Sequence, residues 1–196
     1  MLNKLKNFAD NKYFFEEPLS NVSDGCCEGE NKLIDYDKVK EIIIEEANQQ
    51  TRSSCDGLKI DTEINFFEFK SLKKTLEHNN ELKLIGRLNN SLINKIKDSL
   101  WLFDYIVNHS EHKIKKSEKL EYYDLVKNYY IVTDVDIEKN TKDSLTIKLN
   151  ALATISQSLN RSNELVIEIK NILETLEYSE ITKPKLISCK ELKTLI

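Results

Sequence analysis

The feature that most constrains the fold is a stripe of apolar residues between positions 88 and 107. The residues recur at spacings of three and four, so they share one face of an α-helix over about 88–108. A helix that is apolar along one side must bury that side, against a sheet or other helices or, in a homodimer, against a second copy. The stripe consists of Leu88, Leu92, Ile96, Leu100, Phe103 and Val107, and is widened by Ile93, Leu102 and Ile106.

The segments around this helix predict an α/β fold. Two short runs, 54–60 and 64–70, have the composition of strands and are separated by a polar loop of hairpin length. A third strand is expected at 128–133, because Tyr-Tyr-Ile-Val-Thr suits an inner strand. Further expected elements are helices at about 36–50, 145–160 and 163–178 and a strand at 185–188. This order favours a mixed sheet flanked by helices.

The length of 196 residues suits a single domain. Residues 1–34 are expected to form an N-terminal arm or covering segment, and residues 35–196 the domain. Its core would lie at about 36–133 and a helical C-terminal extension at about 140–196. The segment 71–87 within the core is polar and rich in lysine.

The charge balance excludes a general attraction to polyanions. The chain has 33 acidic and 29 basic residues and a formal net charge of −4, so a nucleic acid would need a local basic patch or bound metal ions. Lys95 and Lys97 on the long helix are interpreted as solvated charge. The best local patch is formed by Lys113, Lys115, Lys116 and Lys119.

The cysteines and the absence of long apolar runs bear on location. No stretch of 18 or more apolar residues occurs, so we expect no membrane partner and a cytoplasmic protein. The cysteines show no CxxC spacing and are therefore predicted to be free thiols in a reducing compartment. They are Cys26, Cys27, Cys55 and Cys189.

Four charged residues are placed where they could converge. In the second strand, a period of two puts Glu68 and Lys70 on one face with Phe66. Asp56 lies at the start of the first strand, so pairing of the two strands would bring it near them. On the preceding helix Glu46 falls within about 20° of Val39, the direction of the apolar face, so it is expected to point inward.

Such a cluster of carboxylates predicts a metal site. Neighbouring carboxylates repel each other unless a cation lies between them, and Mg²⁺ (or Mn²⁺) prefers oxygen ligands. Asp56 and Glu68 are the expected ligands. Lys70 would share the face of Glu68, close enough to orient an attacking water or to neutralise charge on a phosphate. These groups together suit hydrolysis of phosphodiester bonds.

This arrangement resembles the PD-(D/E)XK superfamily of nucleases, which includes restriction endonucleases, Holliday junction resolvases and many defence nucleases. Asp56 matches the first acid of the motif, Glu68 the second acid and Lys70 the lysine, while Glu46 matches the acid often found on the first helix. Cys55 stands in place of the motif's proline. The resemblance covers about 36–133 and implies a restriction endonuclease-like core and a magnesium-dependent nuclease, with DNA as the first expected substrate.

The same residues also allow less specific interpretations. Asp56-Gly57 is a common turn dipeptide, and Glu68 with Lys70 could be a solvated ion pair. The triplet Glu168-Ile169-Lys170 has the same spacing within a helical pattern, so the spacing alone is weak. The alternative function is a non-catalytic interaction or assembly protein, defence-system or phage-related, acting with a partner subunit. Gathering or scattering of the four charged residues in the structure discriminates between the two.

Overall fold

The computed structural model describes residues 13–50, 52–109, 116–137 and 154–196. Within them the chain forms one mixed six-stranded sheet in the order β1-β2-β3-β4-β5-β6. The pairs β1–β2, β2–β3 and β3–β4 are antiparallel, whereas the pairs β4–β5 and β5–β6 are parallel. The strands are β1 (Glu16–Pro18), β2 (Lys32–Asp35), β3 (Gly57–Ile60), β4 (Ile64–Lys70), β5 (Lys127–Thr133) and β6 (Lys185–Ser188).

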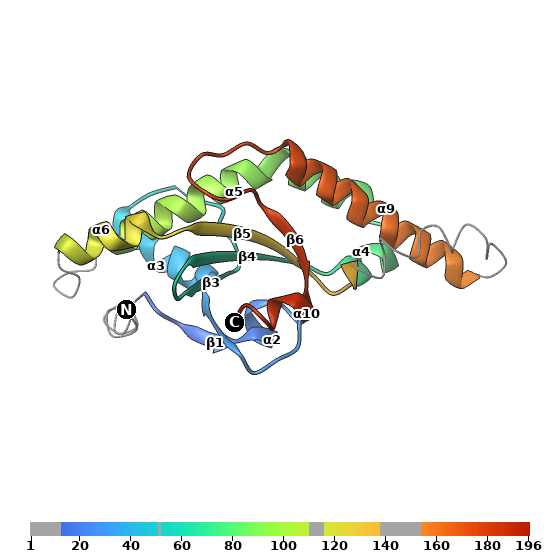
Figure 1. The fold of residues 1–196 in the computed structure, drawn as a ribbon, viewed down its shortest axis with the longest axis horizontal. Coiled ribbons are helices and arrows are strands. Elements are labelled where there is room, and N and C mark those ends of the chain that lie inside the picture. Colours follow the sequence, from blue (N-terminus) through green and yellow to red (C-terminus); the bar gives the residue numbers. More distant parts are fainter. Residues whose placement is uncertain (1–12, 51, 110–115, 138–153) are drawn as a thin grey trace.

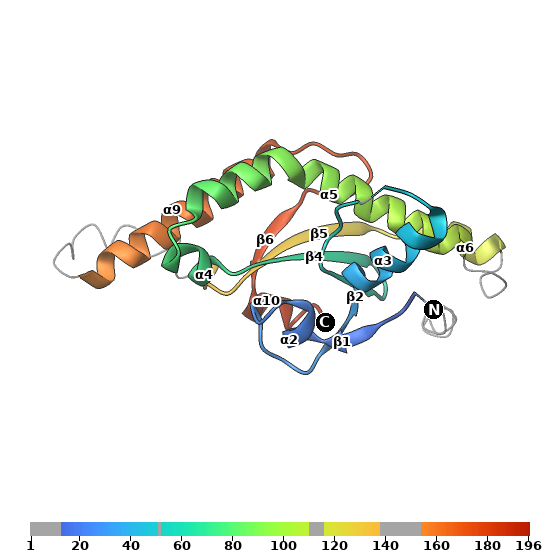
Figure 2. The same cartoon turned by 180° about the vertical axis from the view of Figure 1, so that it is seen from behind.

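Helices cover both faces of this sheet (Figures 1 and 2). On one face α3, α5 and α9 enclose the larger core, and on the other α2 and α10 enclose a smaller one. The expected α/β fold with a mixed sheet flanked by helices is therefore confirmed. The helices are α2 (Leu19–Val22), α3 (Tyr36–Ala47), α4 (Leu72–Glu77), α5 (Glu81–His109), α6 (Lys116–Asp124), α9 (Thr154–Thr175) and α10 (Cys189–Leu192).

Helix α5 buries the predicted stripe within the chain itself, except for Ile93, which is exposed. Leu88, Leu92, Ile96 and Phe103 are almost completely buried and belong to the same core as Phe66 of β4. The helix also begins seven residues earlier than expected, at Glu81 rather than at position 88. The apolar stripe thus packs against the sheet and the other helices of that layer.

The β3–β4 hairpin has the expected faces, but β3 begins at Gly57, three residues later than the predicted position 54. Strand β4 spans 64–70 as predicted, and Gly57 pairs with Phe67 across the hairpin. Phe66 enters the larger core, whereas Phe67 and Phe69 enter the smaller one. Glu68 lies between these phenylalanines in sequence and, by the alternation of the strand, points to the side of Phe66 and α5.

The two ends of the chain contribute more to the sheet than expected. The described part of the segment 1–34 includes β1 and most of β2, and β2 pairs with β3. Strand β6, expected at 185–188, is confirmed and lies parallel to β5, so the C-terminal part is not only helical. Of the two helices expected at 145–160 and 163–178, the described residues show one continuous helix, α9.

The prediction that all cysteines are free is wrong for two of them. Cys27, after α2, and Cys189, at the start of α10, form a disulfide with a Cα–Cα distance of 5.5 Å, while Cys26 and Cys55 are buried free thiols. The two cysteines are 162 residues apart in sequence. They come into contact because α10 follows β6 and packs on the face of the sheet that α2 covers. Among the described helices, none combines the length and apolar character that crossing a membrane requires.

Candidate functional site

Asp56 is held against β4 through its main chain and its side chain. Its amide donates to the carbonyl of Phe67 at 2.9 Å, and its carboxylate Oδ2 accepts from the amide of Phe69 at 2.7 Å. Asp56 therefore bonds to the residues on both sides of Glu68. The carboxylate of Asp56 accepts a hydrogen bond from a backbone amide near the end of β4, so its position is fixed. The turn interpretation therefore does not describe this residue.

Helices α3 and α5 fix the chain next to Asp56. The carbonyl of Asp56 accepts from the amide of Tyr36, the first residue of α3, at 3.0 Å. The hydroxyl of Ser99 on α5 accepts from the amide of Cys55 at 2.9 Å, and the Ser99 carbonyl accepts from the Tyr36 hydroxyl, also at 2.9 Å. Ser99 is fully buried. These hydrogen bonds join the start of β3 to α3 and to α5.

Glu68 is a buried carboxylate with two lysine partners. Only 1% of the residue is exposed, and its Oε1 forms ion pairs with Lys70, two residues along β4, and with Lys95 of α5. The Lys95 ammonium lies 2.6 Å from that oxygen. The other oxygen, Oε2, is buried and has no hydrogen-bond partner among the described residues. The ammonium groups of Lys70 and Lys95 thus pair with one oxygen of Glu68. The Tyr129 hydroxyl, also buried without a hydrogen bond among the described residues, interacts with the same carboxylate.

Asp56 and Glu68 interact electrostatically. Burial raises the pKa of Asp56 to about 7, and the charge of Glu68 adds to the rise, while Lys70, the Phe69 amide and Lys95 offset it in part. For Lys95, burial opposes the charge, but the carboxylates of Glu68 and Asp56 outweigh burial and raise its pKa. Burial and then the charge of Glu68 also raise the pKa of Tyr129 on β5.

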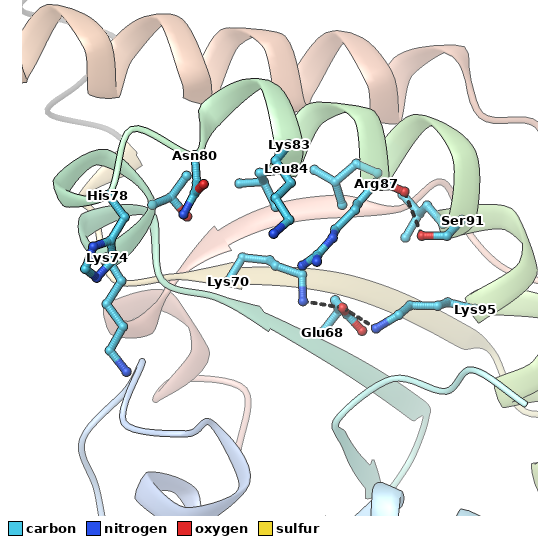
Figure 3. Close-up of a pocket in the computed structure, with 13 residues that line it drawn as sticks. Glu68, Lys70, Lys74, His78, Asn80, Lys83, Leu84, Arg87, Ser91 and Lys95 are labelled. Carbon is cyan, nitrogen blue, oxygen red and sulfur yellow. Dashed lines mark hydrogen bonds and ion pairs between the residues drawn. The ribbon is translucent and has the colours of Figure 1, made fainter. Parts of the chain in front are cut away.

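A basic pocket of about 390 Å³ adjoins this cluster, between α4, α5 and the end of β4 (Figure 3). Glu68 is the only acidic residue among its lining side chains. Because the chain as a whole is acidic, this is a local concentration of positive charge, as anion binding requires. The basic lining residues are Lys70, Lys74, Lys83, Arg87 and Lys95.

The structure brings Asp56, Glu68 and Lys70 together but does not add Glu46. Glu46 is exposed near the C-terminal end of α3, where its Oε2 accepts from the hydroxyl of Tyr13 at 2.7 Å. It lies ten residues from Tyr36, about 15 Å along the helix axis, whereas Tyr36 bonds directly to Asp56. The expectation that Glu46 points inward toward the other acids is wrong, because its carboxylate is exposed to solvent and accepts a hydrogen bond from Tyr13.

The predicted basic patch after α5 is only partly described. Lys113 and Lys115 lie outside the described residues, and Lys116 begins α6. The ammonium of Lys119 donates to the carbonyl of Asn108 at 3.0 Å, at the C-terminal end of α5. Lys119 does not line the pocket beside Glu68, so the structure offers a different basic surface from the one predicted.

Sequence reasoning missed the contribution of α5 to the site. Lys83, Arg87 and Lys95 follow each other at multiples of four residues, directly before the apolar positions Leu84, Leu88 and Ile96. Two parallel stripes at this spacing put the basic residues along the border of the buried face. That signal was present, but the interpretation of Lys95 as solvated charge ignored it.

Asp56 and Glu68 are two candidate ligands for a divalent cation, whereas the described residues gather three potential metal ligands only at Cys26, Cys27 and Cys189. Asp56 and Glu68 supply carboxylate oxygens, the ligand type that Mg²⁺ prefers, and Glu68 Oε2 is buried without a hydrogen-bond partner in the described chain. A cation there would also offset the burial and the repulsion by Glu68, which together raise the pKa of Asp56. The described residues bring two acids together here rather than three, so further ligands would have to be water, main-chain oxygen or substrate.

Comparison with models of protein families, with curated proteins and with solved structures finds no match.

Proposed function

We propose that the protein is a metal-dependent nuclease with its site at Asp56, Glu68 and Lys70. The observation that carries the proposal is the buried carboxylate of Glu68, which lies between Asp56 and Lys70 on paired strands and borders a basic pocket. Buried charges are costly and persist where they are paired or have a role. A phosphodiester substrate would meet both the acids and the lysines there.

Each residue has a distinct part in this chemistry. Asp56 and Glu68 would hold Mg²⁺ or Mn²⁺, which when bound polarises a phosphate and lowers the pKa of a water. Lys70 is held by Glu68 and by the carbonyl of Phe69, 3.0 Å from its ammonium, so its charge is fixed at the end of β4. From there it would orient water or stabilise charge on the phosphate. Lys95 forms a second ion pair with the buried carboxylate of Glu68.

The arrangement supports the resemblance to the PD-(D/E)XK superfamily on three points. First, helix α3 precedes the β3–β4 hairpin. Second, Asp56 lies directly before the first strand of this hairpin, and Glu68 and Lys70 lie on its second strand. Third, a crossover leads from β4 to β5, which is parallel to β4. We therefore propose a restriction endonuclease-like core, with DNA as the first substrate to test. A cytoplasmic location, a role in bacterial defence and a homodimer or partner subunit remain predictions.

Cleavage assays test the proposal directly. Plasmid DNA, single-stranded DNA and RNA are incubated with the protein in Mg²⁺, Mn²⁺ or EDTA. We expect cleavage only with a divalent cation, and a loss of about 10²–10³-fold for Lys70→Ala. Lys97→Ala is the matched control, because Lys97 is an exposed lysine on α5 outside the basic pocket. Activity that persists in EDTA and in Lys70→Ala would contradict a metal-dependent site built on these residues.

One observation favours the non-catalytic alternative. Lys95 lies 2.6 Å from Glu68 and, with Lys70, already compensates the carboxylate without a metal ion. A protein that used the pocket only to bind a phosphate-containing partner could be built in this way. Binding of nucleic acid without cleavage under every cation condition would favour this function. Lys95→Met would then weaken binding, whereas in a nuclease it would mainly lower the cleavage rate.

A further inference from the structure

Two cations in the basic pocket have neither an ion pair nor a side-chain hydrogen bond among the described residues. Lys70 and Lys95 are paired with Glu68, and Lys74 donates to the carbonyl of Asp24 at 3.2 Å. In contrast, the side chains of Lys83 and Arg87 make no ion pair or hydrogen bond within the described part of the chain, yet both line the pocket. Figure 3 shows them reaching from α5 toward Lys70. The pocket therefore holds positive charge that its own acidic residue does not neutralise.

Phosphate is the ligand chemistry that such a pair suits. A guanidinium offers a planar set of donors that matches phosphate oxygens, and a nearby ammonium adds a point charge. Lys83 and Arg87 are one helical turn apart, so they project from the same side of α5. Lys70 extends the positive charge toward the acids. A phosphate bound by Lys83 and Arg87 would thus lie beside the proposed reaction site rather than in it.

The rest of the lining suits a nucleoside rather than more phosphate. Toward α4 the pocket is lined by Thr75, His78 and Asn80, which offer hydrogen-bonding groups, and Leu84 adds an apolar wall. The volume of about 390 Å³ lies toward the small end of the range of about 300–1,000 Å³ that is typical of small-molecule sites. It has room for one nucleotide rather than several.

We propose that this pocket is a nucleotide subsite, which holds a phosphate with Lys83 and Arg87 and the attached nucleoside between Asn80, His78 and Leu84. The inference rests on the proposed nuclease function, since it identifies the part of the substrate next to the cleaved bond. It adds two positioning residues and a recognition role for the α4–α5 corner. The ligand class is a nucleotide with a terminal or bridging phosphate.

Calorimetric titration of the full chain in EDTA tests the subsite without any cleavage. The ligands are the four common nucleoside 5′-monophosphates, the matching nucleosides and inorganic phosphate. We expect at least one monophosphate to bind about tenfold more tightly than phosphate or its nucleoside, because both halves of the pocket contribute. Arg87→Gln and Lys83→Gln should each weaken that binding about tenfold, the scale of one charge-assisted hydrogen bond. Lys97→Gln is the matched control and should bind as the native chain does.

The outcomes separate the subsite from the nuclease proposal. Equal affinity for phosphate and every monophosphate, or no binding of any monophosphate, overturns the nucleotide subsite even if the protein cleaves DNA. Monophosphate binding that depends on Arg87 in a protein without cleavage activity supports the subsite and removes the nuclease function. As a check independent of the variants, amide NMR shifts of the native protein on adding the nucleotide should centre on 78–87, and shifts elsewhere contradict the assignment.

Discussion

The two faces of β4 bury very different groups. Toward α5, Glu68 and Lys70 belong to an ionic cluster that opens into a basic pocket. Toward α2 and α10, Phe67 and Phe69 lie in an apolar core whose covering segments are joined by the Cys27–Cys189 disulfide. The end of β4 thus separates an ionic cluster from the smaller apolar core, although Phe66, on the same side as Glu68, belongs to the larger core. Substitutions on the two faces should therefore fail in different assays.

The largest effect is expected for Glu68→Gln, and it should be an effect on function. The substitution removes a proposed metal ligand and the partner of two lysines, so cleavage should fall by at least about 10²–10³-fold. The unfolding free energy should change less, because the side chains of Lys70 and Lys95 are 27% and 26% exposed and water can solvate them once the carboxylate is lost. Cleavage rates and urea unfolding of the same preparation measure both. A variant that is unfolded would show that Glu68 serves the fold and would remove the contrast between the two faces.

On the opposite face, Phe67→Ala should cost stability. The side chain is fully buried and stacks on Tyr130, with ring centroids 5.5 Å apart. Truncation of a buried phenylalanine typically costs about 3–5 kcal/mol. Urea unfolding should show this loss, while the folded fraction at low temperature should still cleave in Mg²⁺. Loss of cleavage in a folded Phe67→Ala protein would show that the two faces are coupled.

The disulfide should have the next largest effect, again on stability. It closes a loop of 162 residues, and loss of such a bond typically costs about 2–4 kcal/mol. Unfolding of the native chain with and without a dithiol reductant measures the cost, and Cys27→Ser/Cys189→Ser is the reductant-independent comparison. Cys26→Ser is the control, because Cys26 is a free thiol. Equal stability in all of these conditions would mean that α2 and α10 are held by packing alone.

Local patterns allowed much of the fold to be predicted from the sequence. Most of the residues that surround Glu68 could not be predicted in this way. The apolar stripe of α5 and the alternation in β4 are periodic signals within one element, and both were predicted correctly. Asp56, Glu68 and Lys70 were found because hairpin pairing is a short-range event. Lys95 reaches Glu68 from 27 residues away, and its position depends on how α5 crosses the sheet. No pattern within one element contains that information.

Glu46 and the disulfide both show that local spacing does not predict contacts between residues distant in sequence. Helical spacing placed Glu46 toward the apolar face. Its carboxylate instead accepts a hydrogen bond from Tyr13, 33 residues earlier in the chain. Spacing gave no reason to pair Cys27 with Cys189, because the contact depends on the position of β6 at the sheet edge. In both cases a partner distant in sequence determined the outcome. Local geometry alone cannot rank such partners.

The smallest expected effect is a pH dependence that belongs to the ionic face alone. Burial and Glu68 raise the pKa of Asp56 from 3.8 to about 7 in the folded chain. The folded state then binds the proton more tightly than the unfolded state, so this group favours folding below pH 4 and progressively less as pH rises to about 7. The contribution is roughly 1–3 kcal/mol, allowing for the partly exposed side chain.

Urea unfolding at pH 5 and pH 8, for the native chain and for Asp56→Asn, isolates this contribution. Without metal, the native chain should lose more stability than the variant between the two pH values, because the side-chain amide of the variant does not titrate. Adding Mg²⁺ should reduce the difference, since a cation favours the ionised carboxylate and competes with the proton. Phe67→Ala should keep the native pH dependence, because it leaves the ionic face intact. An identical pH dependence in the native chain and Asp56→Asn would show that Asp56 ionises normally, and the two carboxylates would then not share the electrostatic site on which the proposed metal binding depends.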